Sequence, residues 1–141
     1  MANEATIRAS LQIRKGNLTY QSQPSSFTAN MGTAKGPAPG AITIPIAGVE
    51  INVSEFTTPG LCRLMNLDED NFVEYGIFDT EADVFFPLGE LLPGETYILR
   101  FSRNLKEEYA GTGTGTSAPT NKLWFKANTA PCVVLVEIFE V

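Results

Sequence analysis

The sequence contains no histidine, and its 141 residues include only two cysteines, Cys62 and Cys132. Without histidine, the chain lacks the usual general base near neutral pH and the commonest metal ligand in proteins. Two cysteines so far apart in sequence do not form the framework of a zinc site. Each lies in an apolar run, so we expect two buried, reduced thiols. Whether they lie close enough for a disulfide stays open at this point.

The sequence is also poor in positive charge and in long apolar runs. Ten Lys and Arg residues stand against sixteen Asp and Glu residues, which gives a net charge of −6. A surface that binds nucleic acid must neutralise phosphates, so we expect no nucleic-acid partner. No apolar run approaches the length of about 18 residues that a membrane helix needs. The N-terminus lacks a basic region followed by an apolar stretch, which predicts no secretory signal and folding in the cytoplasm.

The patterns of common catalytic sites are missing as well. A Ser, Cys or Lys nucleophile has no histidine to activate it. The glycine-rich run at residues 111–115 lacks the Lys-Ser or Lys-Thr pair of a phosphate-binding loop. Glu90 and Glu95 lie near one turn and could in principle hydrolyse a glycoside, but nothing in the sequence marks either as buried or paired. We therefore predict a protein that is not an enzyme and has no catalytic residue, cofactor or metal.

Short β-strands account for most of the chain. Residues 5–13 alternate apolar and polar side chains, which predicts a half-buried strand, and a turn at residues 15–17 leads into a return strand at 18–22. Residues 132–141 are apolar on both faces, which is typical of a strand in the middle of a sheet or at an interface with another chain. The other expected strands are 41–46, 49–53, 61–67, 72–78, 84–88, 96–101 and 122–127.

Local signals refine this pattern. Pro45 suggests that the strand at 41–46 lies at a sheet edge. Pro93 and Gly94 occupy the central positions of a type II turn. About ten short strands and no long helix predict an all-β fold, an antiparallel β-sandwich of jelly-roll-like form with two long loops, in a single domain over residues 1–141.

The two expected long loops are residues 23–40 and 104–121. Both are rich in Gly, Pro, Ser and Thr. Loops of this length in a small domain are often functional or mobile. Either could be an arm that contacts a neighbouring subunit, and either could be a passive surface loop.

Two further features can be interpreted either as functional sites or as ordinary structural features. The turns within residues 68–83 are crowded with carboxylates, which could bind calcium, although the spacing is not that of an EF-hand and acidic turns also aid solubility. Trp124, Phe125, Tyr97 and Tyr75 could form an aromatic platform for a sugar, but core packing explains them equally simply. Because Trp124 and Phe125 are neighbours on a strand, we expect one to face the core and the other to face outward.

The second half of the chain shows an ordered series of short motifs. They are Leu61-Cys-Arg-Leu-Met-Asn-Leu67, Asp70-Asn-Phe-Val-Glu-Tyr-Gly76, Phe85-Phe-Pro-Leu88, Leu92-Pro-Gly-Glu95 and Leu123-Trp-Phe-Lys-Ala-Asn-Thr-Ala130, followed by the terminal β run. This series, over residues 61–141, resembles small β-rich structural proteins of tailed bacteriophage virions.

The resemblance implies a non-catalytic virion protein of the capsid decoration or cement type. Such a protein would bind the major capsid protein or other virion proteins on the outer shell as a homo-oligomer, and the expected oligomer is a trimer. It would be assembled in the host cytoplasm and would contact neither nucleic acid nor membrane. The alternatives are a tail, connector or head-fibre component of the virion, or a carbohydrate-binding β-sandwich module that uses Trp124 or Tyr97.

Overall fold

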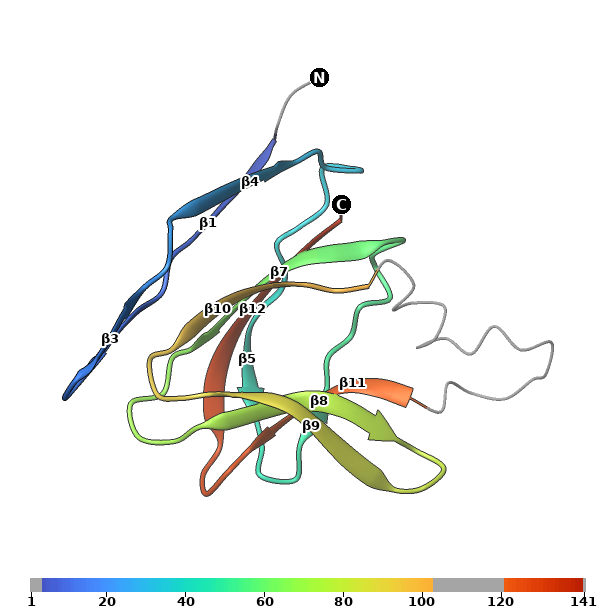
Figure 1. The fold of residues 1–141 in the computed structure, drawn as a ribbon. Coiled ribbons are helices and arrows are strands. Elements are labelled where there is room, and N and C mark those ends of the chain that lie inside the picture. Colours follow the sequence, from blue (N-terminus) through green and yellow to red (C-terminus); the bar gives the residue numbers. More distant parts are fainter. Residues whose placement is uncertain (1–3, 103–120, 141) are drawn as a thin grey trace.

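A computed structural model describes residues 4–102 and 121–140 of the chain. In this described part, every regular element is a β-strand (Figure 1). The strands are β1 (Ala5–Ala9), β2 (Gln12–Lys15), β3 (Leu18–Gln21), β4 (Ser25–Ala29), β5 (Ala38–Ile44), β6 (Val49–Glu50), β7 (Pro59–Asn66), β8 (Val73–Asp79), β9 (Val84–Leu91), β10 (Thr96–Arg100), β11 (Asn121–Ala127) and β12 (Cys132–Glu140).

Strands β5 to β12 form two four-stranded antiparallel sheets, consistent with a β-sandwich. One sheet has the order β10-β7-β12-β5 and the other has the order β6-β11-β8-β9. The pairs are nested along the chain, because β8 pairs with β9, β7 with β10, β6 with β11 and β5 with β12. The all-β, antiparallel prediction is therefore confirmed.

The core lies between the two sheets and is built by alternate residues of each strand. On β12, Cys132, Val134, Val136 and Ile138 point inward and are fully buried. Phe125 of β11 is fully buried as well, and the centroid of its ring lies 5.9 Å from that of Tyr75. Of the two predicted positions for the terminal strand, the middle of a sheet or an interface with another chain, the structure shows the first: β12 lies between β7 and β5.

The structure confirms two predicted turns and one predicted sheet edge. Gly94 has a φ of +71°, and the amide of Glu95 donates to the carbonyl of Leu92 at 3.0 Å, as expected for a type II turn. Pro45 follows the last residue of β5, which is an edge strand. At the first hairpin, Lys15 pairs with Leu18 across a two-residue turn whose first residue, Gly16, has a φ of +56°.

The long loop expected over residues 23–40 is not observed. Residues 25–29 form β4, which pairs with β1, and β5 already begins at Ala38. Composition alone suggested a loop, but pairing with β1 holds this Ser- and Thr-rich segment as a strand. Pro39 and Gly40 of β5 fit because this strand lies at a sheet edge. Of the second expected loop, residues 104–120 lie outside the described part, and Asn121 begins β11.

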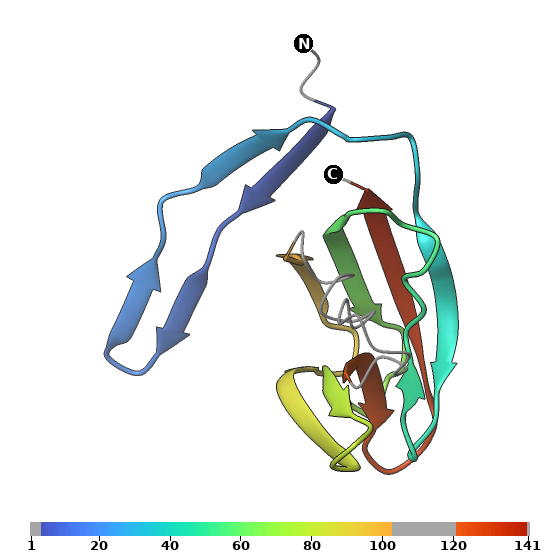
Figure 2. The same cartoon turned by 90° about the vertical axis from the view of Figure 1, so that its right-hand side faces the viewer.

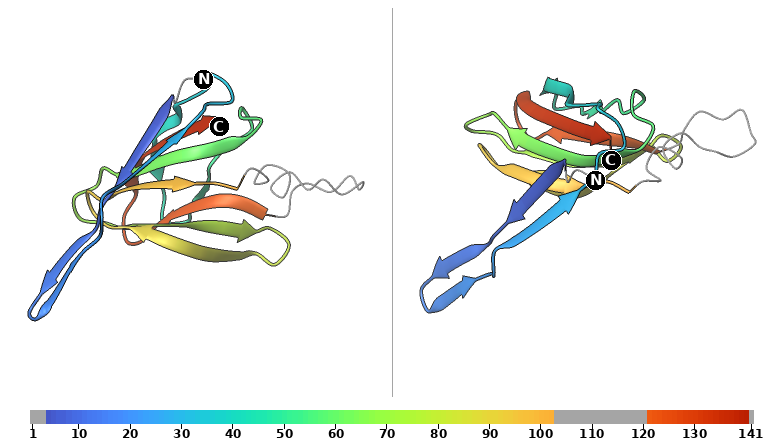
Figure 3. Two further views of the ribbon diagram at one scale, coloured as in Figure 1. Left: turned by 45° about the horizontal axis from the view of Figure 1, so that its top comes forward. Right: turned by 90° about the horizontal axis from the view of Figure 1, so that it is seen from above.

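Residues 5–29 form a two-stranded extension that we call the ribbon. Figure 2 shows the ribbon to one side of the sandwich, separated from it along most of its length, and Figure 3 shows its tip extending past the sandwich. The half-buried strand predicted over residues 5–13 is therefore wrong in one respect, because β2 is exposed along its whole length. Alternation shows which side chains share a face, but it does not show that anything covers that face.

Candidate interaction surface

The ribbon has one face that is largely apolar and one that is polar. Directly paired residues share a face, so the pairs Ile7 with Phe27 and Ile13 with Tyr20 mark the apolar side, together with Leu18. The large apolar side chains of residues 11–27 remain between 39% and 59% exposed. Two-stranded hairpins alone are only marginally stable in water. A surface that covers this apolar side would therefore stabilise the ribbon.

An irregularity divides the ribbon into two halves. The amide of Ser22 donates to the carbonyl of Leu11 at 2.9 Å, and the amide of Leu11 donates to Ser22 Oγ at 2.8 Å. Beyond this point the return strand has one more residue than its partner before Ala9 pairs with Ser25. Pro24 falls in this extra stretch and cannot donate to the ladder. An extra residue of this kind bends a strand pair and increases its twist.

The segment that links the ribbon to β5 is joined to the sandwich by the carboxylate of Glu140, which is 3% exposed. This carboxylate accepts hydrogen bonds from Thr33 Oγ1 at 2.9 Å and from the amides of Thr57 and Thr58 at 3.1 and 3.3 Å. Lys35 Nζ lies 3.6 Å away. Burial raises the pKa of Glu140, but the bonds from Thr33 and Thr58, the charge of Lys35 and the bond from Thr57 together hold it below its ordinary value.

The sequence analysis did not single out Glu140, because this residue was treated only as part of the apolar terminal run. The signal was present in the period of two. Val134, Val136 and Ile138 share the inward face of β12, and the next residue on that face is Glu140. A carboxylate at an inward position must find hydrogen-bond donors. Here the donors come from the segment that links the ribbon to β5 and from the turn before β7.

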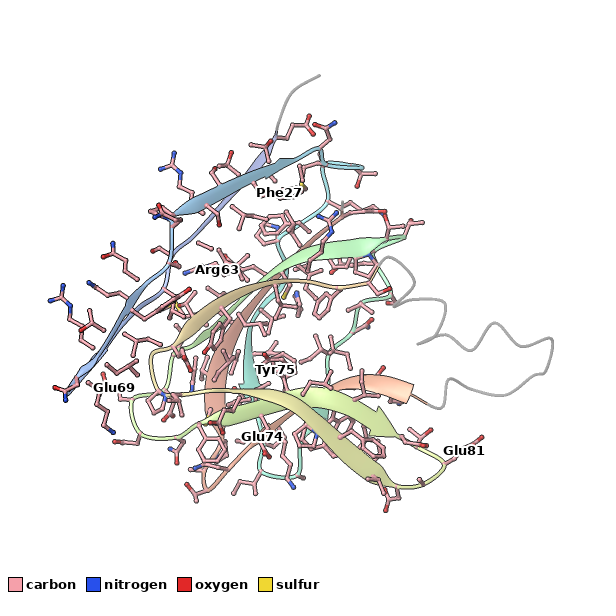
Figure 4. The ribbon with its side chains drawn as sticks, in the orientation of Figure 1. Phe27, Arg63, Glu69, Glu74, Tyr75 and Glu81 are labelled. Carbon is pink, nitrogen blue, oxygen red and sulfur yellow. The ribbon has the colours of Figure 1, made fainter. Side chains whose placement is uncertain are left out.

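A groove of about 370 Å³ lies between the ribbon base and the outer face of the β7 sheet. Its apolar lining includes Ala5, Ile7, Leu61, Ile98 and Phe139. At its rim, Arg63 Nη1 donates to Glu137 Oε2 at 2.7 Å across β7 and β12, and Figure 4 shows Arg63 on the side of the sheet that faces the ribbon. The ion pair is partly exposed, so it contributes at most about 1 kcal/mol.

The charges of the chain are segregated between two segments. The ribbon contains Arg8, Arg14 and Lys15 and no acidic residue. Residues 64–99 contain nine acidic residues and no Lys or Arg. Removing the three positive charges of the ribbon from the net charge of −6 leaves −9 on the remainder of the chain. The ribbon and the acidic segment therefore attract one another electrostatically whenever they meet.

The acidic segment also exposes apolar side chains along β9, the edge strand of its sheet. Val84, Phe86 and Leu88 are 40%, 52% and 71% exposed. Asp79 lies opposite Val84, and on the other face of the sheet Glu74 of β8 lies directly opposite Glu90 of β9 on one side and Lys126 of β11 on the other. Like charges in directly opposed positions destabilise a sheet. Figure 4 shows Glu74 on the outer side of its sheet and Glu81 at the turn between the two strands.

The carboxylates of residues 68–83 serve their own turns. Asp68 Oδ1 accepts from the amides of Asn71 and Asp70 at 2.6 and 2.9 Å, and these bonds hold the pKa of Asp68 below its ordinary value. Asp79 Oδ1 accepts from the amides of Glu81 and Ala82. Among the residues that the structure describes, no three potential ligands among His, Cys, Asp and Glu are grouped as a metal ion requires. The calcium interpretation therefore gains no support from this geometry.

The four aromatic residues considered as a sugar platform are not brought together on one surface. Phe125 is in the core, whereas Trp124 is on the outer side of β11, where its ring stacks on Phe78 with centroids 4.7 Å apart. One residue thus faces inward and the other outward, as predicted. Tyr75 packs against Phe125, and Tyr97 is on β10 of the other sheet, where a hydrogen bond to Glu95 raises its pKa. Glu90 and Glu95 do not form an isolated buried pair either, because Glu95 accepts from the amide of Leu92.

The two thiols are buried and free, as predicted. Cys62 lies opposite Ile138 near one end of β12, whereas Cys132 begins that strand. At roughly 3.3 Å per residue, six residues of strand separate these positions by about 20 Å, which no disulfide can span. Burial, with a smaller effect of Glu137, raises the pKa of Cys62 to about 12. Burial and Asp68 also raise the pKa of Cys132.

The described residues include no helix with the length and apolar character needed to cross a membrane. Comparisons of the chain with protein-family models, with curated proteins and with solved structures find no match.

Proposed function

We propose that this protein is a non-catalytic structural component of a bacteriophage virion, a capsid decoration or cement protein that binds and stabilises the capsid shell as an oligomer. Its eight sandwich strands would form a jelly roll, an architecture that viral capsid domains use repeatedly. The nested pairing of β5 with β12, β6 with β11, β7 with β10 and β8 with β9 supports this, because it is one long hairpin rolled into two sheets.

The observation that carries the proposal is the exposed ribbon on a tightly packed sandwich. The inward residues of β12 are fully buried, whereas the apolar face of the ribbon is open. A protein that works by contacting its neighbours needs such a surface on a rigid scaffold. The resemblance of residues 61–141 to small virion proteins points the same way. Many copies on one shell would turn modest individual contacts into strong attachment.

The test is binding of the purified protein to expanded capsids that lack it. We expect the protein to co-sediment with these capsids and to raise their melting temperature. Because the chain carries a net charge of −6, contact with basic patches of the shell should weaken as salt increases. Absence of binding at low salt would reject the proposal. Co-sedimentation with isolated tails instead would assign the protein to a tail or connector.

The carbohydrate-binding alternative has one supporting observation, the outward stack of Trp124 on Phe78. A flat aromatic surface of this kind can bind the apolar face of a sugar ring. A glycan array with the wild-type protein and the Trp124→Ala variant tests it. Binding that the substitution abolishes, in a variant with an unchanged circular dichroism spectrum, would favour this alternative over the virion role.

A further inference from the structure

We propose that the ribbon of one copy docks on the acidic, apolar β9 edge of a second copy, so that copies join head to tail. The β9 edge comprises the exposed side chains of Val84, Phe86 and Leu88, the carboxylate of Glu81 at the turn before them, and the carboxylates of Glu74 and Glu90 on the opposite face of the same sheet. This inference extends the proposed function by naming the surfaces through which the copies associate.

The first reason is that both surfaces expose apolar side chains. On the ribbon, Leu18 and Tyr20 are 59% and 50% exposed near the tip. On the receiving strand, Phe86 and Leu88 are 52% and 71% exposed. Contact between the two surfaces would remove both sets from water, which is the main driving force of protein association. It would also give the two-stranded ribbon, which is only marginally stable alone, a second layer to pack against.

The second reason is charge complementarity, which selects the partner. The charged side chains of the ribbon are all basic, and Lys15 lies on its apolar face, opposite Leu18, so two ribbons that met through their apolar faces would bring their Lys15 side chains together. The charged side chains of β8 and β9 are all acidic. Lys126 of β11 lies opposite Glu74 on one side, whereas Glu90, at the sheet edge, faces Glu74 on the other, so a further cation beside Glu90 would be favourable. Lys15 on the apolar face and Arg14 on the opposite face, both at the tip of the ribbon, supply such cations. An acidic, apolar surface on a second copy of this chain therefore fits the ribbon, whereas a second ribbon does not.

The third reason is the position of the two surfaces on one molecule. The ribbon touches its own sandwich at the base, where Ala5 and Ile7 line the groove with Leu61 and Ile98. Its tip projects away from the sandwich (Figures 1 and 3). In the described part of the chain, β9 ends its sheet with one backbone edge unpaired. Two different surfaces that join make a head-to-tail contact, and repetition of that contact closes a ring if the rotation allows it.

The test measures the mass of the purified full chain by sedimentation velocity at low and high salt. We expect an oligomer at low salt whose dissociation constant rises with salt, because the contact joins opposite charges. The variant Leu18→Ser/Tyr20→Ser should shift the chain toward monomer. The matched control is Ile46→Ser, which also replaces an exposed apolar side chain by serine. Ile46 is 45% exposed and lies outside both surfaces, so this variant should leave the oligomer intact.

Charge reversal identifies the receiving surface. Arg14→Glu/Lys15→Glu and, separately, Glu81→Lys/Glu90→Lys should each weaken assembly by about tenfold or more. A chain that carries all four substitutions should regain assembly, because each surface again meets the opposite charge. Failure of this rescue would overturn the choice of the β9 edge. A wild-type monomer at low salt, or an oligomer indifferent to Leu18→Ser/Tyr20→Ser, would overturn the role of the ribbon.

These measurements use the protein without capsids, so the two proposals can fail separately. An oligomer with the predicted variant pattern that does not bind capsids would reject the virion role and support this inference. A monomer that binds capsids would do the reverse, and would make the shell the surface that covers the ribbon.

Discussion

Replacement of Asn66 by alanine should destabilise the protein far more than the same replacement at an exposed asparagine. Asn66 is fully buried at the end of β7. Its amide nitrogen donates to the carbonyls of Asn71 at 2.8 Å and Leu91 at 3.2 Å, and its side-chain oxygen accepts from the amide of Asp68 at 3.0 Å. This one side chain therefore joins β7, the acidic turn that follows it and the end of β9.

The expected cost follows from these three hydrogen bonds. Each contributes about 1 kcal/mol net, so Asn66→Ala should lower the free energy of unfolding by about 3 kcal/mol. For a chain of this length, that corresponds to a fall in melting temperature of roughly 10 °C. Asn52→Ala is the matched control, because Asn52 is exposed and its side chain accepts one bond, from the amide of Ser54 at 2.8 Å. Its loss should cost about 0.5 kcal/mol.

Urea unfolding followed by tryptophan fluorescence measures both variants, since Trp124 is the single tryptophan and is stacked on Phe78 in the folded state. The midpoint of Asn66→Ala should fall well below that of Asn52→Ala with similar slopes. Equal midpoints for the two variants would refute the assignment of Asn66 as the polar link between the sheets.

Three further predictions concern other parts of the sandwich. Gly48→Ala should cost about 2 kcal/mol and shift the emission of Trp124, because Gly48 has a φ of +85° and an added Cβ would overlap the indole ring; an unchanged spectrum would contradict this. Because folding lowers the pKa of Glu140, its carboxylate stabilises the fold fully above about pH 4.5, and this stabilisation is lost as the pH falls through the folded pKa. The free energy of unfolding, measured from pH 6 to 3, should therefore depend less on pH in Glu140→Gln than in the wild type. An equal pH dependence in the two proteins would show that other groups cause the acid sensitivity. At pH 8, the buried Cys62 and Cys132 should react with a thiol reagent only when the protein unfolds, and rapid labelling of the native protein would argue against their burial.

The parts of the fold that were predictable from sequence depend on local chemistry. Pro93 and Gly94 fix their own turn, because each has the backbone preference that its position needs. The apolar composition of β12 favours a position inside a sheet, although only its inward face is fully buried and Val133 on the other face is 40% exposed. Alternation along β11 correctly separated Trp124 from Phe125.

The parts that were not predictable depend on pairing between distant segments. β4 looks like a loop by composition, and it is a strand because β1 pairs with it. For the same reason, the ribbon could not be recognised as a projection: residues 5–13 carry the pattern of a covered strand whether or not another surface lies against them. Glu140 was overlooked because a buried carboxylate is identified by its partners, and these come from residues 33–35 and 57–58.

The central claim, that this protein acts by binding a viral shell, is tested most directly by an image reconstruction of the intact particle. The account predicts a two-layered β-domain repeated on the outer surface of the capsid, with neighbouring copies joined through a thin two-stranded extension. Particles that contain the protein only in the tail, or that lack it altogether, would contradict the account.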